Sequence, residues 1–223
     1  MPLTVVWFRQ DLRIYDCEPL LRASRRGQVI PIYIFERSLL HHPEACSAQI
    51  AFTLDCLKAL DIDLQKLGGR LILRSGNPIE ILPNLIAETQ AEGIYAHTDC
   101  DRIYCRVRDA KINAALTERQ MKIRWFEPSA SIDELSAYPK YREKWYEDMN
   151  EAIAPPPQRI VVPDNVASEK IPTLEELGHQ RDGKIIPEGG TEPARSLLRE
   201  FLIIKLKAII GGFHIQVQKP LQA

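Results

Sequence analysis

The run Leu3–Phe8, LTVVWF, and the charged pentapeptide that follows it, RQDLR at 9–13, decide how this sequence is expected to fold. The run is apolar and rich in β-branched residues, and it is bounded by charge. This pattern predicts a strand buried on both faces of a parallel sheet. Ligands of such sheets bind beyond the carboxyl ends of the strands, so the charged loop is the first candidate binding segment.

Four further apolar runs follow, and stretches with helical periodicity separate them. Strands are expected over 29–35, 70–74, 93–97 and 121–126. Helices are expected over 16–26, with Asp16 as the N-cap, and over 44–67, 78–92 and 102–116. Five βα alternations with short, right-handed crossings predict an α/β fold, a doubly wound five-stranded parallel sheet of Rossmann-like form with helices on both faces.

The alternation of strands and helices ends after the fifth strand. We assign 1–135 to the α/β core, 136–190 to an amphipathic helix (138–153) with a proline-rich connector, and 191–223 to a terminal helix and tail. The connector from 154 to 190 carries six of the sixteen prolines. Because proline cannot extend a helix, an extended conformation is expected there.

Composition excludes several classes of function. The chain of 223 residues is 45% hydrophobic and 26% charged, which is ordinary globular composition. Its formal net charge of −1 predicts weak or no DNA binding by this chain alone. No membrane span is expected, since the most apolar stretch, 201–210, is interrupted by Lys205 and Lys207. Arg9 and Asp11 come too early for a signal peptide, so a cytoplasmic location is expected.

Cysteine usage points to free thiols in a reducing compartment. The five cysteines form an odd set without a CxxC pair. Two of them, at 100 and 105, lie near His97, Asp99 and Asp101, but their spacing fits no standard metal motif. The sequence therefore predicts no metal site.

Charged residues gather where the predicted strands end. Arg9 and Arg13 follow the first strand, and arginines there could hold an anionic or planar ligand through bidentate and stacking contacts. Asp11 could instead bond to Arg13 and fix the shape of the loop. Polar strand exits are also expected simply because they are exposed. No GxGxxG, GxxxxGK[ST] or GxSxG motif is present, so dinucleotide, P-loop and hydrolase signatures are absent.

The stretch VVWFRQDLRIYDCEPLLRAS, at 5–24, resembles the N-terminal signature of the photolyase/cryptochrome family. Four further pieces resemble the family in the same order. They are IPIYIFERSLL at 30–40, LILRSGNPIEILPNL at 71–85, YAHTDCDRIYCRVRD at 95–109 and PEGGTEPARSLLREFL at 187–202. The resemblance covers almost the whole chain.

The resemblance implies an antenna-type α/β domain that binds a light-harvesting pigment: a deazaflavin, methenyltetrahydrofolate or FMN. The pigment-binding residues it implies are Arg9, Arg13, Phe35, Glu36, Asp101, Tyr104, Arg106 and Arg108. Family members carry FAD, the pyrimidine-dimer pocket and the electron relay in a helical domain. The serine-rich segment that cradles FAD is absent here, so we expect no FAD, no catalytic residue and no repair activity in this chain.

Two functions remain open. The first is a stand-alone, non-catalytic domain that binds an antenna pigment or a protein partner. The alternative is one half of a split deoxyribodipyrimidine photolyase, completed by a separate FAD-bearing chain. The helix at 196–210 is apolar at ten of fifteen positions, so we expect it to associate with a second copy or an FAD-domain protein, or to fold back on the sheet. A universal-stress-like ATP binder ranks lower, because residues 93–126 contain a single glycine.

Overall fold

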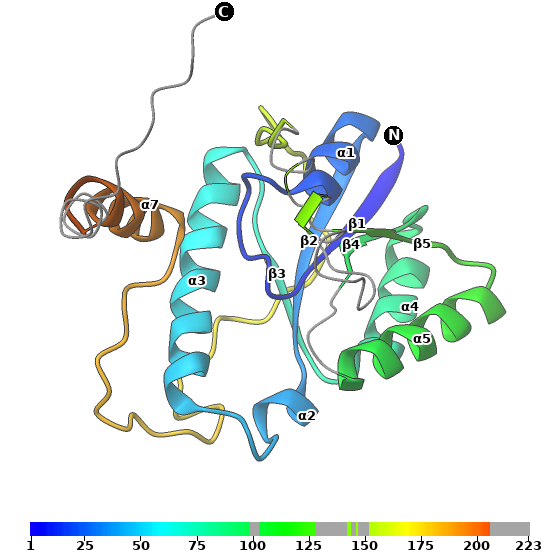
Figure 1. Cartoon of the computed structure of the whole chain (residues 1–223). Coiled ribbons are helices and arrows are strands. Elements are labelled where there is room, and N and C mark those ends of the chain that lie inside the picture. The colour runs from blue at the N-terminus through cyan, green and yellow to red at the C-terminus, as the bar shows by residue number, and fades with distance from the viewer. Residues whose placement is uncertain (99–102, 128–141, 144–145, 147–151, 206–223) are drawn as a thin grey trace, which may run out of the picture.

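The computed structural model describes residues 1–98, 103–127, 142–143, 146 and 152–205, and it has the predicted α/β architecture (Figure 1). Five parallel strands form one sheet in the order β3-β2-β1-β4-β5. Their bounds are β1 Leu3–Phe8, β2 Gln28–Phe35, β3 Ile72–Ser75, β4 Gly93–His97 and β5 Ile123–Phe126. The predicted Rossmann-like sheet is confirmed, and its order reverses between β1 and β4.

The central strand β1 is buried along its whole length. Val5 is in register with Ile30 of β2 on one side and with Ile94 of β4 on the other. Strands flanked by partners and covered on both faces need apolar residues at every position. This requirement explains why LTVVWF is a nearly continuous apolar run, without the alternation of apolar and polar residues that a half-exposed strand would show.

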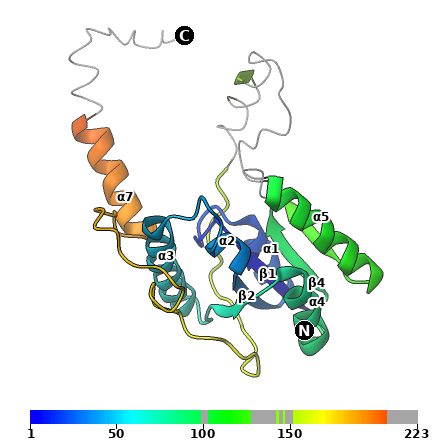
Figure 2. The same ribbon diagram turned by 90° about the horizontal axis from the view of Figure 1, so that it is seen from below.

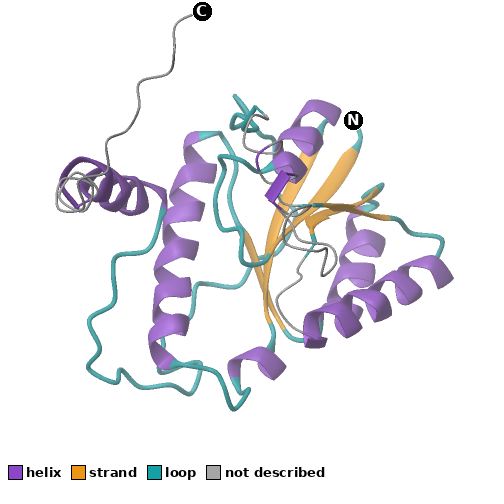
Figure 3. Cartoon of the chain, in the orientation of Figure 1, coloured by secondary structure: helices purple, strands orange, loops and turns teal. Residues whose placement is uncertain are grey.

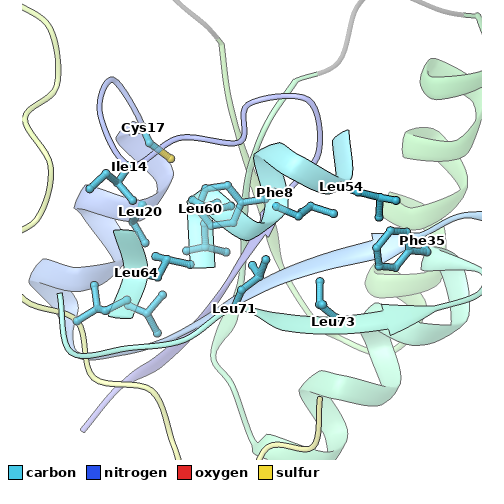
Figure 4. Close-up of a cluster of buried hydrophobic side chains, with 14 of the residues drawn as sticks. Phe8, Ile14, Cys17, Leu20, Phe35, Leu54, Leu60, Leu64, Leu71 and Leu73 are labelled. Atoms are coloured by element: carbon cyan, nitrogen blue, oxygen red, sulfur yellow. The ribbon is translucent and has the colours of Figure 1, made fainter. Parts of the chain in front are cut away.

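Helices cover both faces of the sheet, as Figure 3 shows. Helices α1, Glu18–Arg26, and α3, Ser47–Lys66, pack on the face that receives Val6 and Phe8 (Figure 4). Helices α4, Pro78–Thr89, and α5, Ile103–Glu118, cover the face that receives Val5 and Trp7. The alternation of β1 side chains therefore divides the interior into two apolar clusters.

The connector from 152 to 190 forms no helix or strand, and it packs closely against the sheet. The N–H of Ile160 donates to the carbonyl of Leu67 at 2.9 Å, and the N–H of Glu169 donates to the carbonyl of Leu73 at 2.9 Å. The side chains of Ile160 and Leu174 are buried in the α1–α3 cluster. The connector therefore covers the β3 edge and completes the core.

Several local expectations were wrong. Asp16 does not cap α1, because it lies in the left-handed region with φ 50° and pairs with Arg13. Cys17 is the N-cap residue instead. A short helix α2, Arg37–Leu40, stands where a loop was expected, and α3 starts only at Ser47. The expected helix at 138–153 lies mostly outside the described residues.

The last described elements are α7, Thr191–Glu200, and a π-helical turn η1, Phe201–Lys205. Figure 2 shows α7 beside α3. Two glycines permit this approach, since a Cβ at Gly189 would lie 2.7 Å from the backbone nitrogen of Cys56 and one at Gly190 would lie 2.7 Å from the Cβ of Ala59. The rest of the expected 196–210 helix lies outside the described residues.

In the described part of the chain, no helix combines the length and the apolar character needed to cross a membrane.

Candidate functional site

A cavity of about 800 Å³ lies at the carboxyl ends of β1 and β2, between α3 and α7. The loop after β1 contributes Arg9, Gln10 and Arg13 to its wall. Strand β2 contributes Tyr33 and Phe35, whose rings meet edge to face at 5.0 Å. This is the edge at which doubly wound sheets bind their ligands.

The cavity is apolar along its length and basic at its rim. Helix α3 lines it with Ile50 and Leu54, and α7 with Ala194 and Leu198. Arg195 of α7 also lines the cavity, and its guanidinium lies 4.1 Å from the centre of the Tyr15 ring. Such a surface suits a ligand with a flat apolar body and an anionic end.

Arg9 is held rigidly in the cavity wall. Its Nη1 donates to Asp109 at 2.8 Å, and its Nη2 donates to the carbonyl of His97. Its guanidinium lies over two indole rings that contact each other, 4.9 Å from the centre of Trp7 and 5.2 Å from that of Trp125. These contacts hold the guanidinium in place, so Arg9 shapes the wall and supplies positive charge from a fixed position.

Arg13 is much more accessible than Arg9. Its Nη2 lies 3.0 Å from the carboxylate of Asp16, and both side chains are more than a third exposed. The backbone N–H of Arg13 donates to the carbonyl of Asp11 at 2.7 Å. The side chain of Asp11 contacts His97 instead, so the alternative in which Asp11 bonds to Arg13 holds for the backbone of the loop and not for the two side chains.

Glu36, Tyr104 and Arg108 form a network beside the cavity, in which Glu36 and Arg108 are buried and Tyr104 is exposed at the surface. Arg108 Nη1 donates to Glu36 at 2.7 Å, and the Tyr104 hydroxyl donates to the other Glu36 oxygen at 3.2 Å. Burial raises the pKa of the Glu36 carboxyl, although the charge of Arg108 opposes this shift. Burial lowers the pKa of Arg108, but the charges of Glu36 and Asp109 outweigh it and leave the pKa above its ordinary value. The network joins the end of β2 to the start of α5.

The eight residues suggested by the resemblance therefore separate into groups. Arg9, Arg13 and Phe35 line the cavity. Glu36, Tyr104 and Arg108 belong to the neighbouring network, and Arg106 is exposed on α5. Asp101 lies outside the described residues. Pigment binding by these residues stays a prediction.

Sequence reasoning missed the contribution of α3 and α7 to this cavity. Gln49, Thr53 and Cys56 line it from α3, at the i, i+4 and i+7 positions of one helical face. This spacing was readable, but it was given no role, because Leu54, Leu57 and Leu64 mark a different, apolar face of the helix as the one that packs. The close approach of α7 depends on tertiary packing that no local pattern encodes.

The sheet topology defines an α/β domain of the doubly wound class, and the cavity lies at the edge where domains of this class bind ligands. The family model described as DNA photolyase matches residues 4–157, and the chain belongs to this family. The match begins in β1 and runs through the whole sheet into the connector.

Individual relatives agree with this assignment. The chain is 27% identical over 216 residues to the deoxyribodipyrimidine photo-lyase of Streptomyces griseus, covering 91% of this chain and 47% of that protein. A class III photolyase from Agrobacterium tumefaciens superposes with a TM-score of 0.74 at 27% identity, over 90% of this chain and 44% of that one.

A photolyase from Sulfolobus tokodaii has a TM-score of 0.71 at 21% identity, over 88% of this chain and 46% of that one. At this identity the likeness shows the fold alone. The chain thus spans about half the length of the photolyases it matches.

Proposed function

We propose that this domain binds a planar antenna pigment, a deazaflavin, methenyltetrahydrofolate or FMN, in the cavity beyond β1 and β2. The observation that carries the proposal is the cavity itself, about 800 Å³ in volume, with an apolar body and arginines at its rim. Small-molecule sites in proteins typically enclose about 300–1,000 Å³ and combine such surfaces.

Each part of the pigment has a matching surface. The fused rings would lie against Phe35 and Leu54, and the anionic tail would reach Arg13 and Arg195. Guanidinium groups suit phosphate and carboxylate because they bond to two oxygens at once. The Sulfolobus tokodaii photolyase was described with two FAD molecules and the implication of a novel light-harvesting cofactor. That precedent in a protein of the same fold supports a flavin-like ligand here.

The pigment proposal is tested by titrating the purified chain with FMN, methenyltetrahydrofolate and a deazaflavin, and by following ligand fluorescence. Thr53→Trp fills the cavity from α3, whereas Lys58→Trp places the same side chain on that helix outside the cavity lining. We expect Thr53→Trp to weaken binding at least ~10-fold, about 1.4 kcal/mol, and Lys58→Trp to leave it unchanged. Absence of binding by all three ligands, or equal effects of the two variants, would refute the proposal.

A second candidate function is to form one half of a split photolyase. The observation that favours it is an apolar surface on α7 and η1, where Leu197, Leu198, Phe201, Leu202 and Ile203 are between 43% and 59% exposed. Contiguous apolar surface of this kind marks association sites. The partner in a split photolyase would be a separate chain that carries FAD and the catalytic residues, whereas a second copy of this domain would cover the same surface without completing an enzyme.

Association is tested by analytical ultracentrifugation of the chain alone and mixed with a separately expressed FAD-binding photolyase domain, with light-dependent dimer repair as the second readout. Leu202→Glu in η1 should abolish any complex, while Glu200→Gln at the end of α7 should not. A monomer in both conditions, with no repair, would eliminate the split-enzyme function. The pigment titration would be unaffected by that result.

A further inference from the structure

Beneath the loop after β1, three side chains that commonly bind metals converge from three separate elements. They are Asp11 of the loop, Cys17 at the N-cap of α1 and His97 at the end of β4. One potential ligand atom from each lies within 4.8 Å of the other two. Within the described residues, this is the single group of histidine, cysteine and acidic side chains that meets in this way.

The three residues are withdrawn from solvent. Cys17 is 1% exposed and His97 is 7% exposed, and the Asp11 side chain is 15% exposed. An exposed acidic cluster needs no metal ion, because water solvates its charges. A buried set with one sulfur, one nitrogen and one oxygen donor is instead the ligand chemistry of zinc. Calcium and magnesium select oxygen donors, so the thiol argues against them.

The geometry requires little movement to accept an ion. Asp11 Oδ2 lies 2.5 Å from His97 Nδ1. Zinc–ligand bonds of about 2.0–2.3 Å in a tetrahedron place donor atoms about 3.3–3.8 Å apart. The Asp11–His97 pair would open by about 1 Å, and Cys17 Sγ, which lies within 4.8 Å of both, would approach by about 1 Å at most. Side-chain rotations of this size leave the backbone in place.

Two of the three ligands are already oriented by Arg9. The backbone N–H of Arg9 donates to Asp11 Oδ1 at 3.0 Å, which leaves Oδ2 facing His97. The guanidinium of Arg9 donates to the carbonyl of His97 and fixes the end of β4. Metal sites depend on such outer partners, because they hold the ligands in position before the ion arrives.

There is a simpler explanation of the cluster that needs no metal. The hydrogen bond between Asp11 and His97 would hold those two side chains together, and a buried cysteine often serves as a small apolar side chain. Figure 4 shows Cys17 at the edge of the α1–α3 core cluster. A purely apolar role does not call for a sulfur within 4.8 Å of both a carboxylate and an imidazole. The position of the Cys17 sulfur beside the carboxylate and the imidazole therefore favours a metal site over simple core packing.

We propose that Asp11, Cys17 and His97 bind one zinc ion. The carboxylate and the thiolate neutralise the ion, the neutral imidazole binds through Nδ1, and the displaced protons pass to solvent. Water takes the fourth position from a polar cavity of about 310 Å³ that His97 lines. The ion would join the β1 loop, α1 and β4. It would thus fix the loop that carries Arg9 and Arg13, independently of any pigment.

The test uses the full chain without a histidine tag, stripped of metal and titrated anaerobically with cobalt(II). We expect one equivalent to bind, with tetrahedral d–d bands and a near-ultraviolet thiolate-to-cobalt charge-transfer band that zinc abolishes. Cys17→Ser should lose the charge-transfer band. His97→Gln should weaken zinc binding by more than about 100-fold, since even the loss of an outer partner costs about 10- to 100-fold.

The matched controls are Cys46→Ser and Cys56→Ser, which remove thiols that line the cavity beyond β2 and should keep the band. Circular dichroism establishes that each variant is folded. If Cys17→Ser does not fold, a zinc-dependent rise in the Tm of the unmodified chain, lost in His97→Gln and not produced by magnesium, serves as the second readout. The proposal is overturned if cobalt gives no charge-transfer band, or if the band survives in Cys17→Ser.

Discussion

Arg108 lies 2.7 Å from the carboxylate of Glu36, and their side chains are only 3% and 5% exposed. The two residues are 72 positions apart in the sequence, and their contact joins α5 to the end of β2. Asp109 accepts a second bond from Arg108 at 2.9 Å. Because an unpaired buried charge is costly, these residues depend on each other. Glu36 and Arg108, two of the residues that the family resemblance suggested for pigment binding, thus stabilise the fold at the carboxyl edge of the sheet.

The first prediction concerns this ion pair. Arg108→Met should lower the free energy of unfolding by about 3–5 kcal/mol, because it leaves the Glu36 carboxylate buried without its cation. The double variant Glu36→Gln with Arg108→Met removes both charges, so it should be less destabilising than Arg108→Met alone. Urea unfolding of the three proteins measures the difference.

The control for this prediction is Arg22→Met, which breaks an exposed pair with Glu18 on α1. Exposed pairs contribute about 0–1 kcal/mol, so the control should remain close to the unmodified protein. If Arg108→Met were as mild as Arg22→Met, the buried pair would have no special role in stability.

A second prediction concerns the connector. Ile160 is buried against the α1–α3 cluster, whereas its neighbour Val161 is 40% exposed. Ile160→Ala should therefore cost about 2–5 kcal/mol of stability, the usual range for a buried aliphatic residue. Val161→Ala should cost less than about 1 kcal/mol. Equal, small effects in thermal unfolding would mean that the connector is not part of the folded core.

The sequence patterns predicted the sheet because its three central strands are buried on both faces, which produces apolar runs that need no knowledge of the rest of the chain. They could not predict the contact between Glu36 and Arg108, since nothing in local spacing encodes a partner 72 residues away. The cavity was only half predictable for the same reason. Arg9 and Arg13 follow a recognisable strand, but Thr53 and Arg195 reach the cavity through helix packing.

The third prediction concerns the reactivity of Cys46. Backbone N–H groups of Gln49 and Ala48 at the start of α3 lower the pKa of its thiol, and Lys184, whose Nζ lies 3.9 Å from Sγ, adds to this effect. Burial raises the pKa of Cys56. A lower pKa gives more thiolate at a given pH, so Cys46 should react with iodoacetamide before Cys56 at pH ~7.5.

Mass spectrometry of the alkylated peptides over a pH series measures both rates. The midpoint for Cys46 should fall below the unperturbed thiol value of about 8.5, and Lys184→Ala should move it upward. If Cys56 reacted first, or if the Lys184 variant left the midpoint unchanged, the environment assigned to Cys46 would be wrong.

The last prediction concerns Arg9, which bonds to Asp109 and to the carbonyl of His97 while stacking on Trp7 and Trp125. Arg9→Lys keeps the charge, but an ammonium cannot make these in-plane and stacking contacts together. We expect a loss of about 1.5–3 kcal/mol, the usual contribution of hydrogen bonds to charged groups. The near-ultraviolet circular dichroism of the tryptophans should also change.

Arg13→Lys, in the accessible pair with Asp16, provides the comparison and should cost less than about 1 kcal/mol. If the two lysine variants were equally stable, the planar guanidinium of Arg9 would not matter to the fold, and Arg9 would be available to a ligand. A large difference instead assigns Arg9 to the wall of the cavity. Direct contact with an anionic ligand would then fall to Arg13 and Arg195.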